Sequence, residues 1–246
     1  MRMPAQPVTA HLYRPSAGAR LFAWLVHAYT ATGALFAFAG VIAVIRGEYR
    51  TAFLLMVAAT VVDATDGVFA RMARVKEVTP GFDGARLDDI VDYLTFVFLP
   101  VLVLYHAGTL PAGWGWIPAS AVLLSSAYGF SSADAKTDDH FFTGFPSYWN
   151  IVALYLHAAG LDPVVNGVVL LALAAMVFVR IGYVYPSRTP VLQTVTVVAG
   201  VIWSLMIVAI VWLLPDPPGV LVAASLFFPV YYTVLSFVLH ARRARA

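Results

Sequence analysis

The stretch that decides the fold is DATDGVFARMARVKEVTPGFDGARLDDIVDY, residues 63–93. It holds seven of the 13 acidic residues of the chain, and apolar sequence runs up to it and away from it. Asp63, Asp66, Asp88 and Asp92 lie within or at the edges of those apolar segments. A carboxylate in the middle of a bilayer costs about 2.5–3.5 kcal/mol on insertion scales, so these four groups need something that neutralises them.

Helical spacing places the four carboxylates on two surfaces that can face each other. At about 100° per residue, Asp63 and Asp66 share one face of the helix before the loop. Asp88 and Asp92 are four residues apart and share one face of the helix after it. Carboxylate oxygens are the ligands of hard divalent cations, and the chain has no cysteine, which favours magnesium or manganese over zinc or copper. Four carboxylates exceed the charge of one ion, so two ions are expected.

A second interpretation is an ion-paired helix interface, in which Asp66 or Asp88 binds Arg71 or Arg86. Four aligned acids outnumber the one or two aligned bases, so excess negative charge would remain. Asp89 points away from the acidic face, at about 140° from Gly84, and a solvated role is expected for it.

The composition outside this stretch is that of a membrane protein. Of the 246 residues, 61% are hydrophobic and 11% are charged, whereas soluble domains carry about 25% charged residues. A helix needs about 20 apolar residues to cross the hydrocarbon layer. We therefore predict an all-α integral membrane protein with about eight transmembrane helices, at residues 21–45, 51–72, 85–105, 116–131, 148–159, 164–184, 191–214 and 220–240.

The placement of basic residues predicts the orientation. With eight spans, 13 of the 15 Lys and Arg residues lie on the side of the two termini, and Arg46 and Arg50 lie on the other side. Cytoplasmic loops are enriched in Lys and Arg, so both termini and the acidic site are expected at the cytoplasmic face. Residues 1–20 form a cytoplasmic N-terminal segment, either an interfacial helix or a disordered tail. Residues 21–246 form a single transmembrane catalytic domain.

The acidic stretch matches a known signature at every fixed position. The pattern D-x-x-D-G-x-x-A-R, a spacer and G-x-x-x-D-x-x-x-D is present from Asp63 to Asp92. The chain therefore resembles the CDP-alcohol phosphotransferase family, and the resemblance implies the fold of that family. Its twelve-residue spacer, 72–83, is longer than in most members. This spacer, the eight spans and the run DAKTDDHFFTGFPSYWN at 134–150 resemble the bacterial phosphatidylcholine synthase branch.

The resemblance implies an enzyme of the bacterial inner membrane that transfers the phosphatidyl group of CDP-diacylglycerol to choline and releases CMP. It also implies a homodimer and no nucleic-acid partner. Asp63, Asp66 and Asp88 would bind the metal ions with Asp92 also in reach, and Asp92 would be the general base for the choline hydroxyl. The residues that would contact the CDP moiety are Asp66, Gly67, Ala70, Arg71 and Gly84.

The choline site is predicted from the chemistry of a quaternary ammonium group, which binds aromatic faces. The candidate rings are Tyr128, Phe145, Tyr148, Trp149 and Tyr183, although aromatic residues also form belts at membrane interfaces. Arg180 and Arg188 are candidates for contacts with lipid phosphate, or for anchors of the positive-inside kind.

Two other functions stay open at this point. One is the same chemistry with another acceptor, namely serine, glycerol phosphate or inositol phosphate. The other is a membrane cation transporter, whose carboxylates would lie along a path through the bilayer instead of at one edge.

Overall fold

The computed structural model describes residues 15–132, 141–184, 189 and 191–243. Most of the N-terminal segment 1–20 and Arg188 lie outside this part of the chain. The fold is all-α, as predicted, with one short pair of strands that was not predicted. The helices are α1 (Ala17–Ile45), α2 (Tyr49–Met72), α3 (Val75–Val78), α4 (Gly84–Asp92), η1 (Tyr93–Phe98), α5 (Leu99–His106), α6 (Trp116–Ser131), α7 (Trp149–Ala158), α8 (Pro163–Met176), α9 (Gln193–Trp212), α10 (Gly219–Ser225) and α11 (Phe227–Arg243).

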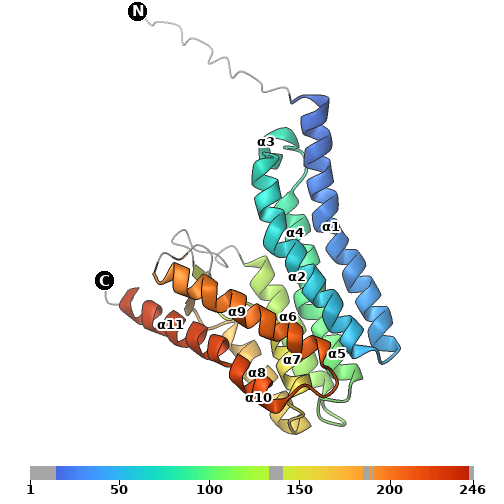
Figure 1. Ribbon diagram of the computed structural model, residues 1–246, viewed down its shortest axis with the longest axis vertical. Coiled ribbons are helices and arrows are strands. Elements are labelled where there is room, and N and C mark those ends of the chain that lie inside the picture. Colours follow the sequence, from blue (N-terminus) through green and yellow to red (C-terminus); the bar gives the residue numbers. More distant parts are fainter. Residues whose placement is uncertain (1–14, 133–140, 185–188, 190, 244–246) are drawn as a thin grey trace, which may run out of the picture.

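The first two helices run antiparallel and side by side, and they project beyond the other helices, with α3 at the far end (Figure 1). Small residues on α1 let the helical segment formed by α4, η1 and α5 approach closely. A Cβ atom on Gly33 would overlap Val91 of α4, and a Cβ atom on Gly40 would overlap Leu99 of α5. Close approach through small residues is the usual way in which membrane helices pack.

The third helical segment runs without a break from Gly84 to His106, which is close to the predicted span 85–105. Its middle portion, η1, is a π-helix, with a wider turn than the α-helices on either side. The hydroxyl of Thr95 donates a 3.0 Å hydrogen bond to the Val91 carbonyl across the junction between α4 and η1. π-Helical turns within α-helices are frequent at functional sites.

The predicted span 164–184 ends early, and this part of the prediction was wrong. Helix α8 stops at Met176, and residues 182–184 form strand β2 (Gly182–Val184), which pairs antiparallel with β1 (Phe141–Thr143). The segment after β1 contacts the end of α8, where the Phe145 amide donates a 3.1 Å hydrogen bond to the Met176 carbonyl.

Side chains of the C-terminal helix, α11, form hydrogen bonds with the outer edge of β2. Tyr232, Ser236 and His240 are spaced by four residues and therefore lie on one face of α11. The Tyr232 hydroxyl donates to the Val184 carbonyl at 3.0 Å, the Val184 amide donates to Ser236 Oγ at 3.1 Å, and the Gly182 amide donates to His240 Nδ1 at 3.2 Å.

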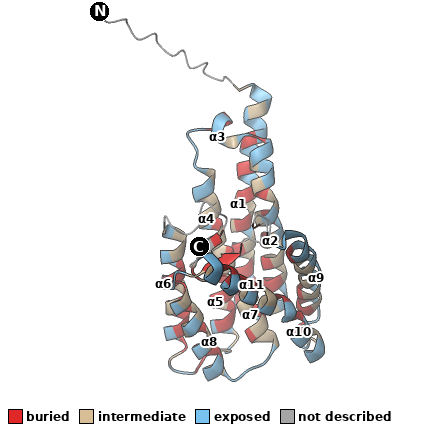
Figure 2. Cartoon of the chain, turned by 90° about the vertical axis from the view of Figure 1, so that its left-hand side faces the viewer, coloured by how far each residue is buried: buried red, intermediate tan, exposed pale blue. Residues whose placement is uncertain are grey.

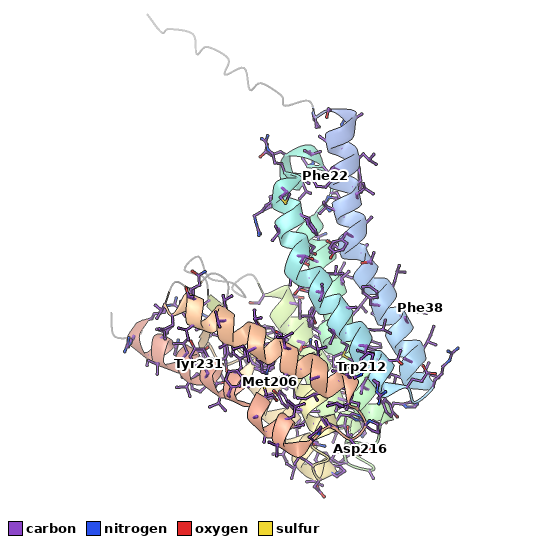
Figure 3. The ribbon with its side chains drawn as sticks, in the orientation of Figure 1. Phe22, Phe38, Met206, Trp212, Asp216 and Tyr231 are labelled. Atoms are coloured by element: carbon purple, nitrogen blue, oxygen red, sulfur yellow. The ribbon has the colours of Figure 1, made fainter. Side chains whose placement is uncertain are left out.

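In the described part of the chain, four helical segments are long and apolar enough to cross a membrane. They are Ala17–Ile45, Tyr49–Met72, Gln193–Trp212 and Gly219–Arg243. Figure 2 shows exposed residues along the outer faces of these helices. Many of these residues are large and apolar, including Phe22 and Phe38 on α1 and Trp212 on α9 (Figure 3). Such a surface suits lipid and not water, so the membrane class is confirmed, whereas the count of eight spans stays a prediction.

Helices α6 and α7 coincide with predicted spans, α8 covers the first part of one, and all three are short. They contain 16, 10 and 14 residues. At 1.5 Å per residue, ten residues extend about 15 Å, which is about half of the hydrocarbon thickness. Their buried side chains join a core that includes Phe53 of α2, Leu104 of α5, Leu154 of α7 and Leu170 of α8.

Candidate active site

Helix α2 carries two of the four predicted metal ligands. Asp63 and Asp66 lie three residues apart, so their side chains share a side of the helix. Asp66 is buried, and the hydroxyl of Thr30 on α1 donates a 2.8 Å hydrogen bond to its Oδ2. Thr30 lies outside the acidic signature, and this hydrogen bond fixes the orientation of the Asp66 carboxylate.

Helix α4 brings the other two carboxylates against α2. One carboxylate oxygen from each of Asp63, Asp88 and Asp92 lies within 4.8 Å of the other two, and all three residues are partly buried. We call these three residues the carboxylate cluster. Asp66 lies outside this group, about one turn further along α2. The structure therefore brings three of the four predicted ligands together.

The carboxylate cluster has the chemistry and the spacing of a site for a hard cation. Oxygen ligands lie about 2.0–2.6 Å from magnesium or calcium, so two oxygens on one ion are at most about 5 Å apart. The cluster meets that limit with oxygen ligands from two facing helices. It also gathers the acids at one point, whereas the transporter interpretation requires them along a path.

The ion-paired alternative named Arg71 and Arg86 as partners of the acids. Arg86 lies on α4 with its Nε 3.9 Å from the Asp83 carboxylate, and both side chains are exposed. Arg71 is exposed in the last turn of α2. At the same end of the molecule, Arg74 forms an ion pair with Glu77.

The twelve-residue spacer is anchored on α1. It folds into the single turn α3, and Thr79 follows this turn. The Thr79 hydroxyl donates to the Val75 carbonyl at 2.9 Å and lies 3.0 Å from Nε2 of the buried His27, so His27 is the donor in that second contact. The ring of Phe82 packs 4.5 Å from that of His27. A histidine within an apolar segment was the only sequence signal of this anchor.

The predicted CDP-contacting residues lie in the C-terminal part of α2 and at the start of α4. Gly67 and Ala70 are half-buried, and a Cβ atom on Gly67 would meet only Arg71 Nη1, at 3.4 Å. Gly84 differs, because a Cβ atom there would lie 2.9 Å from Cε1 of His27. Its lack of a side chain thus serves the packing of α4 against α1, a role that the sequence did not indicate.

Four of the five predicted choline-binding rings come together near the strand pair. Phe145 lies 5.0 Å from Trp149 and 6.5 Å from Tyr183 between ring centroids, and Tyr183 and Tyr148 both approach Tyr232, at 6.2 and 6.3 Å. Trp149 and Tyr183 are buried, and burial raises the pKa of the Tyr183 hydroxyl. The rings of Phe145, Trp149 and Tyr183 pack on one another, Phe145 and Tyr148 are partly buried, and the faces of Trp149 and Tyr183 are therefore largely covered.

The remaining predicted residues lie apart from that aromatic group. Tyr128 is exposed on α6, and its ring is 5.0 Å from that of Phe178. Tyr128, Phe178 and Arg180 line a small cavity of about 40 Å³ beside the end of α8. Arg180 is therefore close to a predicted ring.

Comparison with known proteins gives a consistent set of relatives, although no family model matches the chain. A phosphatidylcholine synthase of Legionella bozemanae is 37% identical over 197 residues, which is 77% of this chain and 91% of the relative. One from Pseudomonas aeruginosa is 35% identical over 210 residues, covering 84% and 88%. One from Rhizobium meliloti is 33% identical over 228 residues, covering 92% and 94%.

Proposed function

The chain belongs to the bacterial phosphatidylcholine synthases, enzymes of the CDP-alcohol phosphotransferase type, and on that premise we propose how its residues transfer a phosphatidyl group from CDP-diacylglycerol to choline. The convergence of Asp63, Asp88 and Asp92 supports this proposal. A substrate diphosphate is negatively charged, and three carboxylates beside it are compatible with the reaction only if cations lie between them. Family membership and the carboxylate cluster thus point to the same chemistry.

The carboxylate cluster would hold magnesium or manganese, with Asp66 as a further ligand and two ions in all. The bound cations would neutralise the diphosphate and polarise the phosphorus–oxygen bond. Asp63 and Asp88 would fix their position from opposite helices. The Thr30 hydroxyl would keep the Asp66 carboxylate in a single orientation.

Asp92 would act as the general base. It would take the proton from the choline hydroxyl while the alcohol oxygen forms a bond to the phosphorus of the phosphatidyl group. The bond from that phosphorus to the bridging oxygen breaks, and CMP leaves with this oxygen. Gly67, Ala70, Arg71 and Gly84 would lie against the CDP moiety, and Arg71 could bind phosphate.

The membrane arrangement that fits this chemistry has about eight spans in the bacterial inner membrane. Both termini and the carboxylate cluster would lie at the cytoplasmic face, as the distribution of 13 against 2 basic residues indicates. A site at that edge can receive a lipid from the bilayer and a soluble alcohol from the cytoplasm. A homodimer is proposed from the resemblance to the family.

An acceptor panel tests this function. Purified protein is mixed with CDP-diacylglycerol and labelled choline, serine, glycerol phosphate or inositol phosphate, with magnesium or manganese. We expect labelled phosphatidylcholine and CMP in equal amounts. Incorporation of another alcohol in place of choline would contradict the acceptor assignment. Absence of CMP from every mixture would contradict the transferase itself.

A further inference from the structure

A cavity of about 680 Å³ lies between α4 and α6, beside the carboxylate cluster but not lined by it. At about 100° per residue, Asp89 lies about 60° around α4 from Asp92, and Tyr93 lies about 100° from it. The cavity thus opens on the adjoining face of the same helix. Its lining includes Asp83 just before α4, Arg86, Asp89 and Tyr93 from α4 and its continuation, and Phe130 and Ser131 from α6.

The charged groups of the cavity leave one negative charge uncompensated. The Asp83 carboxylate accepts a hydrogen bond of 3.1 Å from the Arg86 amide and lies 3.9 Å from the Arg86 guanidinium, so these two groups are engaged with each other. The side-chain carboxylate of Asp89 has neither a hydrogen bond nor an ion pair with any described residue. The cavity is therefore suited to a ligand with one positive charge.

The two aromatic rings of the cavity favour a quaternary over a primary ammonium group, which the charge alone would not distinguish. Tyr93 and Phe130 meet edge to face, with ring centroids 6.0 Å apart and planes at 87°. The Tyr93 hydroxyl donates a 2.9 Å hydrogen bond to the Leu123 carbonyl, so it uses its one donor elsewhere. Aromatic faces beside a carboxylate suit a quaternary ammonium group, which has no hydrogen-bond donors. A primary ammonium group has three donors and needs acceptors that these rings do not supply.

We propose that this cavity binds the trimethylammonium group of choline, with Asp89 opposite its charge and the rings of Tyr93 and Phe130 against its methyl groups. The proposal rests on the choline transfer proposed above and gives the acceptor a place beside the general base. Residues three apart on a helix are neighbours, with about 5–6 Å between their Cβ atoms. A small alcohol whose ammonium group is bound at Asp89 would therefore lie within about one helical turn of Asp92.

This assignment differs from the cage predicted from the sequence. Phe145, Trp149 and Tyr183 pack on one another, and Trp149 and Tyr183 are buried. Neither of the two cavities described here is lined by these three rings. Asp89, for which a solvated role was expected, instead faces a cavity with two rings.

Steady-state kinetics of Asp89→Asn and Phe130→Leu test the proposal. We expect each change to raise the KM for choline about tenfold, since each removes one of the groups that attract the cation. The KM for CDP-diacylglycerol should change less than about twofold, and Asp89→Glu should restore most of the choline affinity. An unchanged KM for choline in both variants would overturn the site.

Matched controls separate this role from a general disturbance. Glu77→Gln removes an exposed carboxylate at the same end of the molecule, and Phe22→Leu removes an exposed ring from α1. Neither should alter the KM for choline. Loss of CDP-diacylglycerol affinity in parallel with choline affinity would assign Asp89 and Phe130 to structure and overturn the proposal.

Direct binding keeps the site testable if the proposed function fails. If the wild-type protein forms no phosphatidylcholine, the proposed transfer reaction is contradicted. The choline site is then tested by equilibrium binding of labelled choline to purified protein. Binding to the wild type that Asp89→Asn weakens about tenfold would support the site. Equal binding to both proteins, or no binding to the wild type, would overturn it.

Discussion

In the proposed mechanism Asp92 has the most demanding position of the four signature carboxylates, because it would have to reach both the cations and the acceptor alcohol. It belongs to the carboxylate cluster and lies one turn from Asp89 at the cavity. Asp66, by contrast, is buried and held by Thr30. Four acids of one signature therefore have different environments, and substitutions should separate their roles.

Asp92→Asn should lower kcat at least about a hundredfold, because an amide cannot accept the hydroxyl proton. The protein should still fold, since the amide has nearly the same shape as the carboxylate. Turnover and the elution profile in detergent are the measurements. Glu77→Gln is the control, and near-normal turnover of Asp92→Asn would exclude the base role.

Thr30→Val should raise the concentration of magnesium or manganese needed for half-maximal activity about tenfold, because a hydrogen bond to a charged group contributes about 1.5–3 kcal/mol. Metal binding measured without substrate should weaken in parallel. Thr32→Val is the matched control, since the Thr32 hydroxyl donates only to the Tyr29 carbonyl of its own helix, at 2.6 Å. Equal metal dependence in the two variants would contradict a positioning role for Thr30.

Helical periodicity was enough to predict the helix faces on which the carboxylates lie, but it could not predict the cavity. Spacings of three and four residues are short-range, so the faces of Asp63, Asp88 and Asp92 can be read from the sequence. The surroundings of Asp89 depend on where α6 packs, and α6 lies far from it in the chain. Trp149 shows the same limit, because its Nε1–H donates to Ser126 on α6 at 2.7 Å.

At the scale of elements, the segment between β1 and α7 depends on one glycine. Gly144 has φ +79°, and a Cβ atom there would overlap the Val177 carbonyl. The Gly144 amide donates to the Ile181 carbonyl at 2.9 Å, which ties the segment to the approach to β2. This backbone conformation and this close approach each exclude a larger residue.

Gly144→Ala should therefore lower the melting temperature in detergent more than Gly160→Ala does. Gly160 also has a positive φ, +58°, but nothing lies within 4 Å of the position of its Cβ atom. The control, Gly160→Ala, should therefore lose only the free energy needed to hold an alanine at positive φ, about 1–2 kcal/mol. An equal loss in both variants, measured by thermal unfolding, would show that contact with Val177 is unimportant.

The elements that sequence reasoning located best are the long apolar helices, because their pattern is local. It placed α1 and α2 within a few residues, and the segment from α4 to α5 as one unit. It could not find β1 and β2, since each has three residues and is stabilised by a partner distant in the sequence. The Phe178–Arg180 region looked helical because it is apolar up to the arginine.

At the scale of the whole molecule, the absence of cysteine permits a direct test of orientation. Asp216 lies in the loop between α9 and α10, and Pro80 lies in the spacer after α3, at the opposite end of the molecule (Figures 1 and 3). Replacing either residue by cysteine gives a variant with a single thiol. A membrane-impermeant maleimide should label Asp216→Cys in spheroplasts and spare Pro80→Cys. Labelling of Pro80→Cys before lysis would contradict a cytoplasmic active site.

Side chains of α11 occupy the outer edge of β2, and this limits how copies of the protein can meet. An exposed strand edge offers free amide and carbonyl groups to any extended peptide nearby, which is a route to aggregation. Here the Gly182 amide and both polar groups of Val184 are already bonded to Tyr232, Ser236 and His240. In a crowded leaflet, neighbouring molecules cannot add a third strand at these positions, so any association between them has to use other surfaces.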